Sequence, residues 1–294
     1  MIDNITIRFK DKVLADQIFK SKDDYDMKVS RSGGEIKTSY CKIGNLRVRS
    51  TSTFTELTGS LHTFFNMKNK SIDGNYDDFS YTQIIKALDS LEEIFGCPLS
   101  EMRLINFEFG FNLVVPYDPT FLIEEKILLY KFRAPCINPQ NEKNKKIKIF
   151  TQENYMIKIY DKSKESNLSH HVLRMEIVFR SKDLFNKMGI DTLSDLKNKD
   201  VYVNMFEYFM LAFENLIIID CYCGTEEMSR DLRLLLSMYT NPTCWINLKK
   251  NGTKHKYLKH RMLFLEKIKD YGLDSKKKEL RALLNEKFVQ LLNS

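Results

Sequence analysis

The pattern of hydrophobic and polar residues predicts strands through the first two thirds of the chain. Apolar residues recur at alternate positions there, which is the pattern of a strand with one buried face. The predicted strands are 2–9, 47–56, 103–115, 155–160 and 172–179. A glycine turn is predicted at Gly33-Gly34, and the segments 134–146 and 161–171 have the composition of exposed loops.

Helical patterns interrupt the strands once and then replace them. Ser80 and Gln83 form a capping box in front of apolar residues at helical spacing, and Gly96 ends that helix just before Pro98. Four further helices are predicted at 202–215, 226–239, 255–270 and 278–292. Strands with one interleaved helix, followed by helices, predict an α+β fold built on an antiparallel sheet with packed helices.

The composition is that of a globular protein. The chain has 294 residues, of which 43% are hydrophobic and 29% charged, and this length is ample for a large core. No run approaches the roughly 20 apolar residues of a membrane helix, since the best candidate, 216–219, is stopped by Asp220. The start of the sequence has no secretion signal, so the six cysteines are expected to be reduced. We therefore expect a cytoplasmic protein with no membrane contact.

The positive charge is concentrated at one end of the chain. The chain holds 46 Lys and Arg and 39 Asp and Glu, a net charge of +7. Residues 245–294 hold 13 of these cations and 5 of the acids, a net charge of +8, which leaves 33 cations and 34 acids, a net charge of −1, for residues 1–244. A basic end on a neutral body indicates a polyanion partner such as nucleic acid, although a solvated helical tail has the same composition.

Three predicted strands place polar groups on the face opposite their apolar residues. Alternation assigns Glu108 to this face in the first strand, Lys158 and Tyr160 in the second, and Arg174 and Glu176 in the third. If the three strands are neighbours, two carboxylates, a tyrosine and several cations converge on one sheet face. The alternative is an antiparallel sheet with a solvated face, on which the same residues form ordinary cross-strand pairs.

The converging set suits metal-assisted phosphoryl transfer. Glu108 and Glu176 offer hard oxygen ligands of the kind that Mg²⁺ or Mn²⁺ prefers. Tyr160 is a candidate nucleophile, and because a phenol has a pKa near 10 it needs a base or cation nearby, for which Lys162 is placed. Tyr155 is the rival nucleophile, five residues earlier and therefore on the opposite face. The sequence has no phosphate-binding glycine loop, so an NTP-driven enzyme is not expected.

Several short blocks occur in a fixed order along residues 1–220. They are Met1-Ile2-Asp3, Gly59-Ser60-Leu61-His62-Thr63-Phe64-Phe65-Asn66 with Asn75 and Asp78-Phe79, Phe107-Glu108-Phe109-Gly110-Phe111-Asn112, Ile159-Tyr160-Asp161-Lys162 with Leu173-Arg174-Met175-Glu176, and Gly189-Ile190 with Thr192-Leu193-Ser194-Asp195-Leu196. In these blocks the chain resembles the replication initiators of filamentous phages and related plasmids, the gene II protein family. That family is related to the HUH-type nicking enzymes of rolling-circle replication.

The resemblance implies a Rep-like nickase. Such an enzyme cuts one strand of a single-stranded or hairpin origin with a tyrosine, stays joined to the 5′ end as a phosphotyrosyl intermediate, and leaves a 3′-OH for the host polymerase. Carried over to this sequence, Tyr160 would be the nucleophile, Lys162 its activator and Arg174 a contact to the scissile phosphate. Glu108 and Glu176 would hold Mg²⁺ or Mn²⁺, with His62 as a third candidate ligand, because the paired-histidine motif is absent. A lone His near aromatic residues is also a common packing residue.

The resemblance also implies that two parts of the chain have different roles. Residues 1–220 would form the catalytic domain and residues 221–294 a helical, basic accessory segment that grips phosphates. The candidate DNA-binding residues are Lys158, Lys249, Lys250, Lys254, Lys256, Lys259 and Arg261. Trp245 and Tyr257 interleave these cations and are candidates for stacking on bases, or for packing the helix. Removal of the last 50 residues is then expected to weaken DNA binding and to spare cutting.

Other partners and two rival functions complete the prediction. A host helicase and polymerase are expected to cooperate with such an initiator, and a homodimer is a candidate assembly. The first rival function is a non-catalytic DNA-binding regulator of replication or copy number with the same fold. The second is a protein-interaction module whose basic end meets acidic partners and which has no salt-dependent affinity for DNA.

Overall fold

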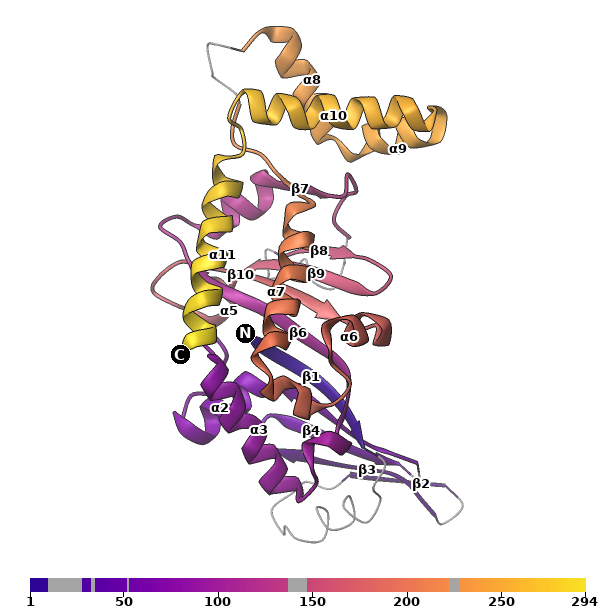
Figure 1. The fold of residues 1–294 in the computed structure, drawn as a ribbon, viewed down its shortest axis with the longest axis vertical. Helices are drawn as coiled ribbons and strands as arrows, with labels where there is room; N and C mark the ends of the chain where they lie inside the picture. Colours follow the sequence, from indigo (N-terminus) through magenta and orange to yellow (C-terminus); the bar gives the residue numbers. More distant parts are fainter. Residues whose placement is uncertain (10–27, 33–34, 52, 137–146, 223–227) are drawn as a thin grey trace.

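A computed structural model of the chain describes residues 1–294 except 10–27, 33–34, 52, 137–146 and 223–227 (Figure 1). The glycine turn predicted at 33–34, most of the predicted loop 134–146 and the predicted start of a helix at 226 lie outside the described residues.

One large antiparallel sheet forms the body of the protein. Its strand order is β2-β3-β4-β5-β1-β6-β10-β9-β8, and all the neighbouring strands are antiparallel. The strands are β1 (Ile2–Phe9), β2 (Lys28–Ser32), β3 (Glu35–Ile43), β4 (Leu46–Thr51), β5 (Thr55–Ser60), β6 (Arg103–Val114), β8 (Ile147–Thr151), β9 (Tyr155–Asp161) and β10 (Val172–Phe179). The predicted α+β class with an antiparallel sheet is confirmed.

The strand predicted at 47–56 is wrong in one respect, because the chain reverses inside it. β4 ends at Thr51 and β5 begins at Thr55. The Thr51 hydroxyl accepts from the amide of Phe54, and it also donates to the Phe54 carbonyl oxygen. A threonine that bonds its own turn in this way favours a reversal over a continued strand.

Ten helices are described besides shorter helical turns. They are α2 (Leu61–Asn69), α3 (Tyr81–Phe95), α4 (Pro119–Phe121), α5 (Lys162–Ser166), α6 (Lys182–Met188), α7 (Lys199–Glu214), α8 (Arg230–Thr240), α9 (Pro242–Asn251), α10 (Lys254–Asp270) and α11 (Ser275–Asn293). The single turns are η1 (Leu99–Glu101), η2 (Leu122–Lys126) and η4 (Leu193–Lys197). None of the described helices combines the length and the apolar composition that crossing a membrane requires.

Local sequence signals explain where several helices begin and end. Ser80 and Gln83 form the predicted capping box of α3, and Gly96 ends that helix in a left-handed conformation at φ 59°. The loop predicted at 161–171 is wrong at its start, because the Asp161 side chain accepts from the Lys164 amide and begins α5. α9 was not predicted, although Asn241 followed by proline is an ordinary helix start.

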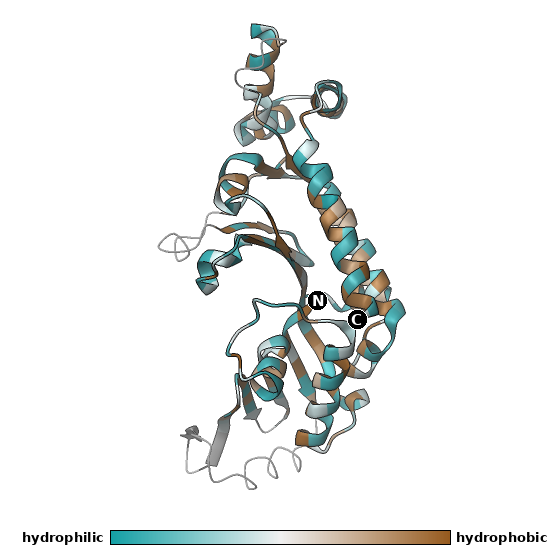
Figure 2. Ribbon diagram, turned by 90° about the vertical axis from the view of Figure 1, so that its left-hand side faces the viewer, coloured by the Kyte–Doolittle hydropathy of each residue, from teal (hydrophilic) through white to brown (hydrophobic). Residues whose placement is uncertain are grey.

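The helices α3, α6, α7 and α11 pack on the apolar face of the sheet. Phe109 and Phe111 of β6 contact Phe209 of α7 at ring-centroid distances of 6.1 and 5.3 Å, and Phe111 also contacts Phe288 of α11. Phe107 meets Phe185 of α6 on the same face. Figure 2 shows this helical layer, with α11 ending at the C-terminus, on one side of the curved sheet.

A second, smaller core lies at the other end of the molecule, where α8, α9 and α10 gather beyond the sheet (Figure 1). It forms around Trp245 and Phe264. A two-stranded sheet of β7 (Ile127–Tyr130) and β11 (Leu216–Ile218) borders it, and Ile217 of β11 and Phe132, which follows β7, belong to this core. The division between the two cores does not coincide with the predicted domain boundary at residue 220, because α11, which follows that boundary, packs in the first core. The assignment of catalytic and accessory domains stays a prediction.

Candidate functional site

The three strands with polar faces are neighbours in the sheet, in the order β6-β10-β9. Glu176 of β10 stands opposite Gly110 of β6 and Lys158 of β9, and Arg174 stands opposite Tyr160 of β9. Residues directly opposite one another share a face. The structure therefore brings together all five groups that alternation assigned to one side, and we call this side, opposite the helical layer, the polar face.

A third carboxylate, which the sequence did not reveal, joins the two glutamates. Carboxylate oxygens of Asp3, Glu108 and Glu176 all lie within 4.8 Å of one another, and all three residues are buried. β1 pairs Ile2 with Phe109 but Ile5 with Phe107, so Asp3 and Asn4 together oppose Glu108. This bulge brings Asp3 into the cluster, while the Asn4 amide donates to Glu108 Oε2 at 2.5 Å.

Two cations neutralise most of the charge of the three carboxylates. The Lys158 ammonium donates to Glu108 Oε1 at 2.5 Å and to Glu176 Oε1 at 3.0 Å. The Arg174 guanidinium donates through Nε to Glu176 Oε2 at 2.7 Å and through Nη2 to Asp3. Burial alone would lower the pKa of Lys158, but the carboxylates of Glu176 and Glu108 outweigh it and raise that pKa. Lys158, predicted to contact DNA, thus lies inside the carboxylate cluster.

Gly110 leaves room for the cluster to form. A Cβ at this position would lie 2.4 Å from the Met175 carbonyl oxygen and 2.5 Å from the Glu176 Cβ. Both distances are far inside van der Waals contact, so any side chain here would push β10 away from β6. Only glycine allows Glu176 to stand this close to the neighbouring strand.

The loop after α2 is fastened to the site by Asn75. The Asn75 side chain donates to Asp3 Oδ2 at 2.5 Å and accepts from the Lys162 ammonium at 2.6 Å. Its carbonyl oxygen accepts from Arg174 Nη1 at 3.1 Å and from Asn112 Nδ2 at 3.3 Å. A side-chain amide can donate to a carboxylate and accept from an ammonium at once, so Asn75 links the carboxylate cluster to Lys162.

Tyr160 lies at the edge of this network and is buried, with 8% of its surface exposed. Its burial raises the pKa of the phenol above the ordinary value, while Arg174 acts in the opposite sense. The Lys162 ammonium lies 6.0 Å from the ring centroid, and burial lowers the pKa of that lysine. Tyr160 is therefore a neutral phenol in this state, with a lysine close to it.

Tyr155, the rival nucleophile, lies on the opposite face of β9 as expected. Its hydroxyl bonds to the Tyr130 hydroxyl at 2.5 Å, and its ring packs edge-on against Tyr208 of α7. Tyr155 is part of the first core. It faces the helical layer and not the carboxylates.

His62 does not belong to the carboxylate trio, although the sequence made it a candidate ligand. Its Nε2 lies 2.8 Å from Asp77 Oδ1, and its ring stacks on Phe79 at 4.6 Å. Burial lowers the pKa of His62 below its ordinary value, with Asp77 opposing. Asp77 also pairs with Lys70 at 2.6 Å. His62 therefore helps to anchor the loop that carries Asn75, and the packing interpretation describes its position.

The cations predicted to grip DNA divide into two groups. Those around the turn between α9 and α10 are exposed and, in the described part of the chain, form no ion pairs; they are Lys249, Lys250, Lys254, Lys256 and Lys259. Arg261 is partly buried, with its guanidinium 4.5 Å from the centroid of Phe132. Two cations of α11 form ion pairs within the protein, Arg281 with Glu214 and Lys287 with Asp78.

Two expectations for the C-terminal segment are corrected by the structure. Trp245 is not available for stacking on bases, because it is 2% exposed and its Nε1 donates to the Tyr239 carbonyl oxygen at 2.7 Å. Removal of the last 50 residues would not leave the rest of the fold intact, since Leu284 and Phe288 of α11 are buried in the first core. Short amphipathic segments rich in lysine look alike in sequence whether they cover a core or stand in solvent.

The carboxylate trio has the chemistry of a divalent-cation site. Three oxygen donors of this kind match the preference of Mg²⁺ and Mn²⁺ for hard ligands. Lys158 and Arg174 supply two positive charges against the three negative ones, so one carboxylate charge is left over. Burial and the neighbouring Glu176 accordingly raise the pKa of Glu108. Asp3, Glu108 and Glu176 therefore fit a bound cation, which would compensate the excess charge.

Comparison with solved structures finds a similar protein. It is the rolling-circle replication initiator protein from Geobacillus stearothermophilus, with 10% sequence identity over 82% of this chain and 96% of that chain, and a TM-score of 0.39. No family model matches the chain, and no curated protein is similar to it. A TM-score of 0.39 is too low for this likeness to bear on the chemistry of the site.

Proposed function

We propose that the protein is a rolling-circle replication initiator that nicks and rejoins single-stranded origin DNA, as its resemblance to the gene II family implies. The observation that carries the proposal is the meeting of Asp3, Glu108 and Glu176 within 4.8 Å on the face that also holds Tyr160 and Arg174. These carboxylates come from three different strands. A solvated sheet face would not need to bury three carboxylates together.

The chain supplies the groups for attack by a tyrosine. The Tyr160 oxygen would bond to the scissile phosphorus as the P–O3′ bond breaks, which leaves a 5′-phosphotyrosyl link and a free 3′-OH. The phenol proton would pass to Lys162 in its amine form, whose pKa is lowered by burial, and the departing 3′ oxygen would take a proton from water. Arg174 would pair with a phosphate oxygen as charge develops there. Rejoining reverses these transfers.

The carboxylates would hold the cation that such phosphoryl transfer uses. A Mg²⁺ or Mn²⁺ ion supplies Lewis acidity toward a phosphate oxygen when it is bound. Asp3, Glu108 and Glu176 would bind it, and Lys158 would release at least one carboxylate in exchange. Asn75 would hold the side chains of Asp3 and Lys162 in place during that exchange, because it forms a hydrogen bond with each of them.

Covalent capture tests the proposed nucleophile. A pool of 3′-labelled hairpin oligonucleotides with randomised single-stranded loops would be incubated with the protein and Mn²⁺, and adducts would be isolated under denaturing conditions and sequenced. We expect an adduct with the unaltered protein and none with Tyr160→Phe. The matched control is Tyr155→Phe, which removes one hydroxyl from the same strand but on the opposite face. An adduct that persists in Tyr160→Phe would refute the assignment.

One observation favours the second candidate, a DNA-binding regulator that does not cut. Lys158 and Arg174 already bond to every carboxylate of the trio, which is how a purely structural cluster is stabilised. The same capture experiment separates the two functions. DNA binding with no adduct in the unaltered protein, at any loop sequence in the pool, would favour the regulator.

A further inference from the structure

A row of exposed side chains crosses the polar face on the side of the sheet away from Tyr160. Tyr40 of β3 stands opposite Arg49 of β4, Arg49 opposite Glu56 of β5, and Glu56 opposite Arg8 of β1. The side chains of Arg49 and Arg8 are 41% and 44% exposed, and Tyr40 is also exposed, at 44%. Register thus lines up two arginines and an aromatic ring on one surface.

A second row runs beside the first. Lys42 of β3 stands opposite Arg47 of β4, Arg47 opposite Thr58 of β5, and Thr58 opposite Thr6 of β1. Lys42 and Arg47 are exposed, while the alternate residues of these strands belong to the first core. We call the two rows the basic sheet surface, and its charged members are Arg8, Lys42, Arg47, Arg49 and Glu56. Four cations and one carboxylate give it a net charge of +3.

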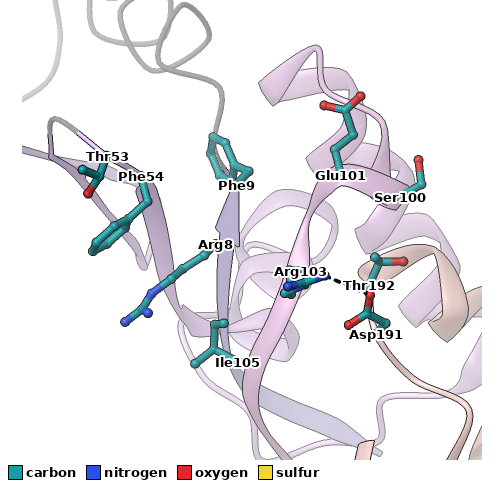
Figure 3. A pocket seen from close by; sticks show the side chains of 10 residues that line it. All are labelled: Arg8, Phe9, Thr53, Phe54, Ser100, Glu101, Arg103, Ile105, Asp191 and Thr192. Atoms are coloured by element: carbon teal, nitrogen blue, oxygen red, sulfur yellow. Dashed lines mark hydrogen bonds and ion pairs between the residues drawn. The ribbon is translucent and has the colours of Figure 1, made fainter. Parts of the chain in front are cut away.

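A hollow of about 600 Å³ opens at the end of the first row, between the β4–β5 turn and the start of β6 (Figure 3). Arg8 and Ile105 lie between its two walls, with Phe54 on one wall and Arg103, paired with Asp191, on the other. The Arg8 guanidinium lies 4.7 Å from the centroid of Phe54. A hollow of this size with an aromatic wall can receive a planar base, and a phosphate there would pair with Arg8 or Arg103 in exchange for Glu56, which lies 2.7 Å from Arg8 Nε, or for Asp191.

The basic sheet surface and the carboxylate cluster lie on the same face of the sheet, and β1 contributes residues to both. Arg8, Thr6 and Asn4 alternate along β1, and Asn4 bonds to Glu108 of the cluster. Four residues separate Arg8 from Asn4, so the first row lies roughly 13 Å from the cluster along the strand. A chain that crosses the cluster can therefore continue directly over the two rows.

We propose that the basic sheet surface is a binding track for single-stranded DNA, which leads one side of the cut strand away from the carboxylate cluster. The inference rests on the proposed function and adds the path of its substrate. A sheet face that carries cations and an exposed aromatic ring offers phosphate contacts and a stacking platform, both of which suit unpaired bases. Bases of a duplex are stacked inside the helix and cannot use Tyr40 or the hollow.

The track is tested by binding without cutting. Anisotropy of a fluorescein-labelled oligo-dT 20-mer would be measured with the full-length chain in EDTA between 50 and 300 mM KCl. Arg47→Gln with Arg49→Gln is expected to weaken binding roughly tenfold and to lower the salt slope by about 1.4, the value for two phosphate contacts on a single strand. Tyr40→Ala is expected to weaken binding at least fivefold with the slope unchanged.

Matched controls remove the same charge from the other side of the protein. Lys86→Gln with Lys187→Gln changes two exposed lysines of α3 and α6, in the helical layer, and should leave affinity and slope as they were. Arg47→Gln alone changes one exposed side chain, so it tests the track even if the double variant fails to fold. A double variant that binds oligo-dT as the controls do would overturn the track, and so would a greater loss for a duplex 20-mer than for oligo-dT.

The two proposals fail in different ways. An adduct in the covalent capture experiment together with unchanged oligo-dT binding by the double variant would refute the track alone. Oligo-dT binding that depends on Arg47 and Arg49, with no adduct from the unaltered protein, would refute the nicking activity and support the track.

Discussion

Replacement of Lys158 by methionine tests whether the carboxylate trio can hold a cation. The side chain becomes one atom shorter and loses its ammonium group, which lies 2.5 Å from Glu108 Oε1 and 3.0 Å from Glu176 Oε1. Arg174 then remains, and it pairs with Asp3 and Glu176 but not with Glu108. The site of the variant carries one more uncompensated negative charge than the original site.

The expected loss of stability follows from the burial of the pair. Removal of one partner from a buried ion pair costs about 3–5 kcal/mol, and since the Lys158 side chain is 21% exposed we expect about 3 kcal/mol. In a chain of this size 1 kcal/mol corresponds to about 2 °C, so the melting temperature should fall by about 6 °C in EDTA. Mn²⁺ at 100 times its dissociation constant would return about 2.7 kcal/mol, which is most of the loss.

Thermal unfolding in EDTA and in Mn²⁺ measures both quantities. Lys164→Met is the matched control, because that lysine is 53% exposed and pairs with the exposed Asp118. Its removal should lower the free energy of unfolding by less than about 1 kcal/mol, and the variant should gain as much from Mn²⁺ as the unaltered chain does. The decisive quantity is the gain in melting temperature on adding Mn²⁺, compared between Lys158→Met, Lys164→Met and the unaltered chain.

Either of two results would refute the reasoning about the site. If Lys158→Met gains no more from Mn²⁺ than the control does, the carboxylates do not bind a cation even when their own ammonium partner is gone. If Lys158→Met is as stable as the unaltered protein in EDTA, the lysine does not compensate a buried charge.

The remaining predictions concern the loop, the sheet and the C-terminal helix. Burial lowers the pKa of His62, so the stability that the neutral imidazole contributes is present above the unfolded-state pKa near 6.5 and is lost as the pH falls below that value. The urea midpoints at pH 7.5 and pH 5.5 should therefore differ less in His62→Gln than in the unaltered chain. Gly110→Ala should lower the free energy of unfolding by about 1–3 kcal/mol and abolish adduct formation. Gly96→Ala should lower the same free energy, measured by chemical unfolding, by about 1–2 kcal/mol and leave adduct formation unchanged. Phe288→Ala, which removes a ring stacked 4.0 Å from Phe206, should cost about 3–5 kcal/mol in the same assay.

Alternation along single strands predicted the polar face well because its signal is local. Glu108, Tyr160 and Glu176 each follow an apolar residue in a strand of period two, and each lies on the face that this period assigns. The adjacency of their strands is not local information. The paired residues of β6 and β10 are 58 to 72 positions apart in the chain, and no pattern within either strand identifies the other as its neighbour.

Asp3 was missed because a bulge breaks the period that alternation relies on. Ile2 and Ile5 are both buried and three residues apart, whereas Ile5 and Ile7 are two apart. That change of spacing in a strand is the mark of an inserted residue, and it was the available signal for Asp3. Trp245 carried no such signal, since Phe132, against which its ring packs, lies more than 100 residues earlier in the chain.

The central place of β1 in the sheet governs when the site can form during synthesis. Asp3 contacts Arg174, 171 residues further along the chain. At translation rates of 5–20 residues per second, roughly 9–35 seconds pass between the synthesis of the two residues. A nascent chain therefore carries β1 without β6, and β6 without β10, for much of its time on the ribosome. The carboxylates meet only after β10 has emerged, so no truncated product that lacks β10 can assemble the cluster.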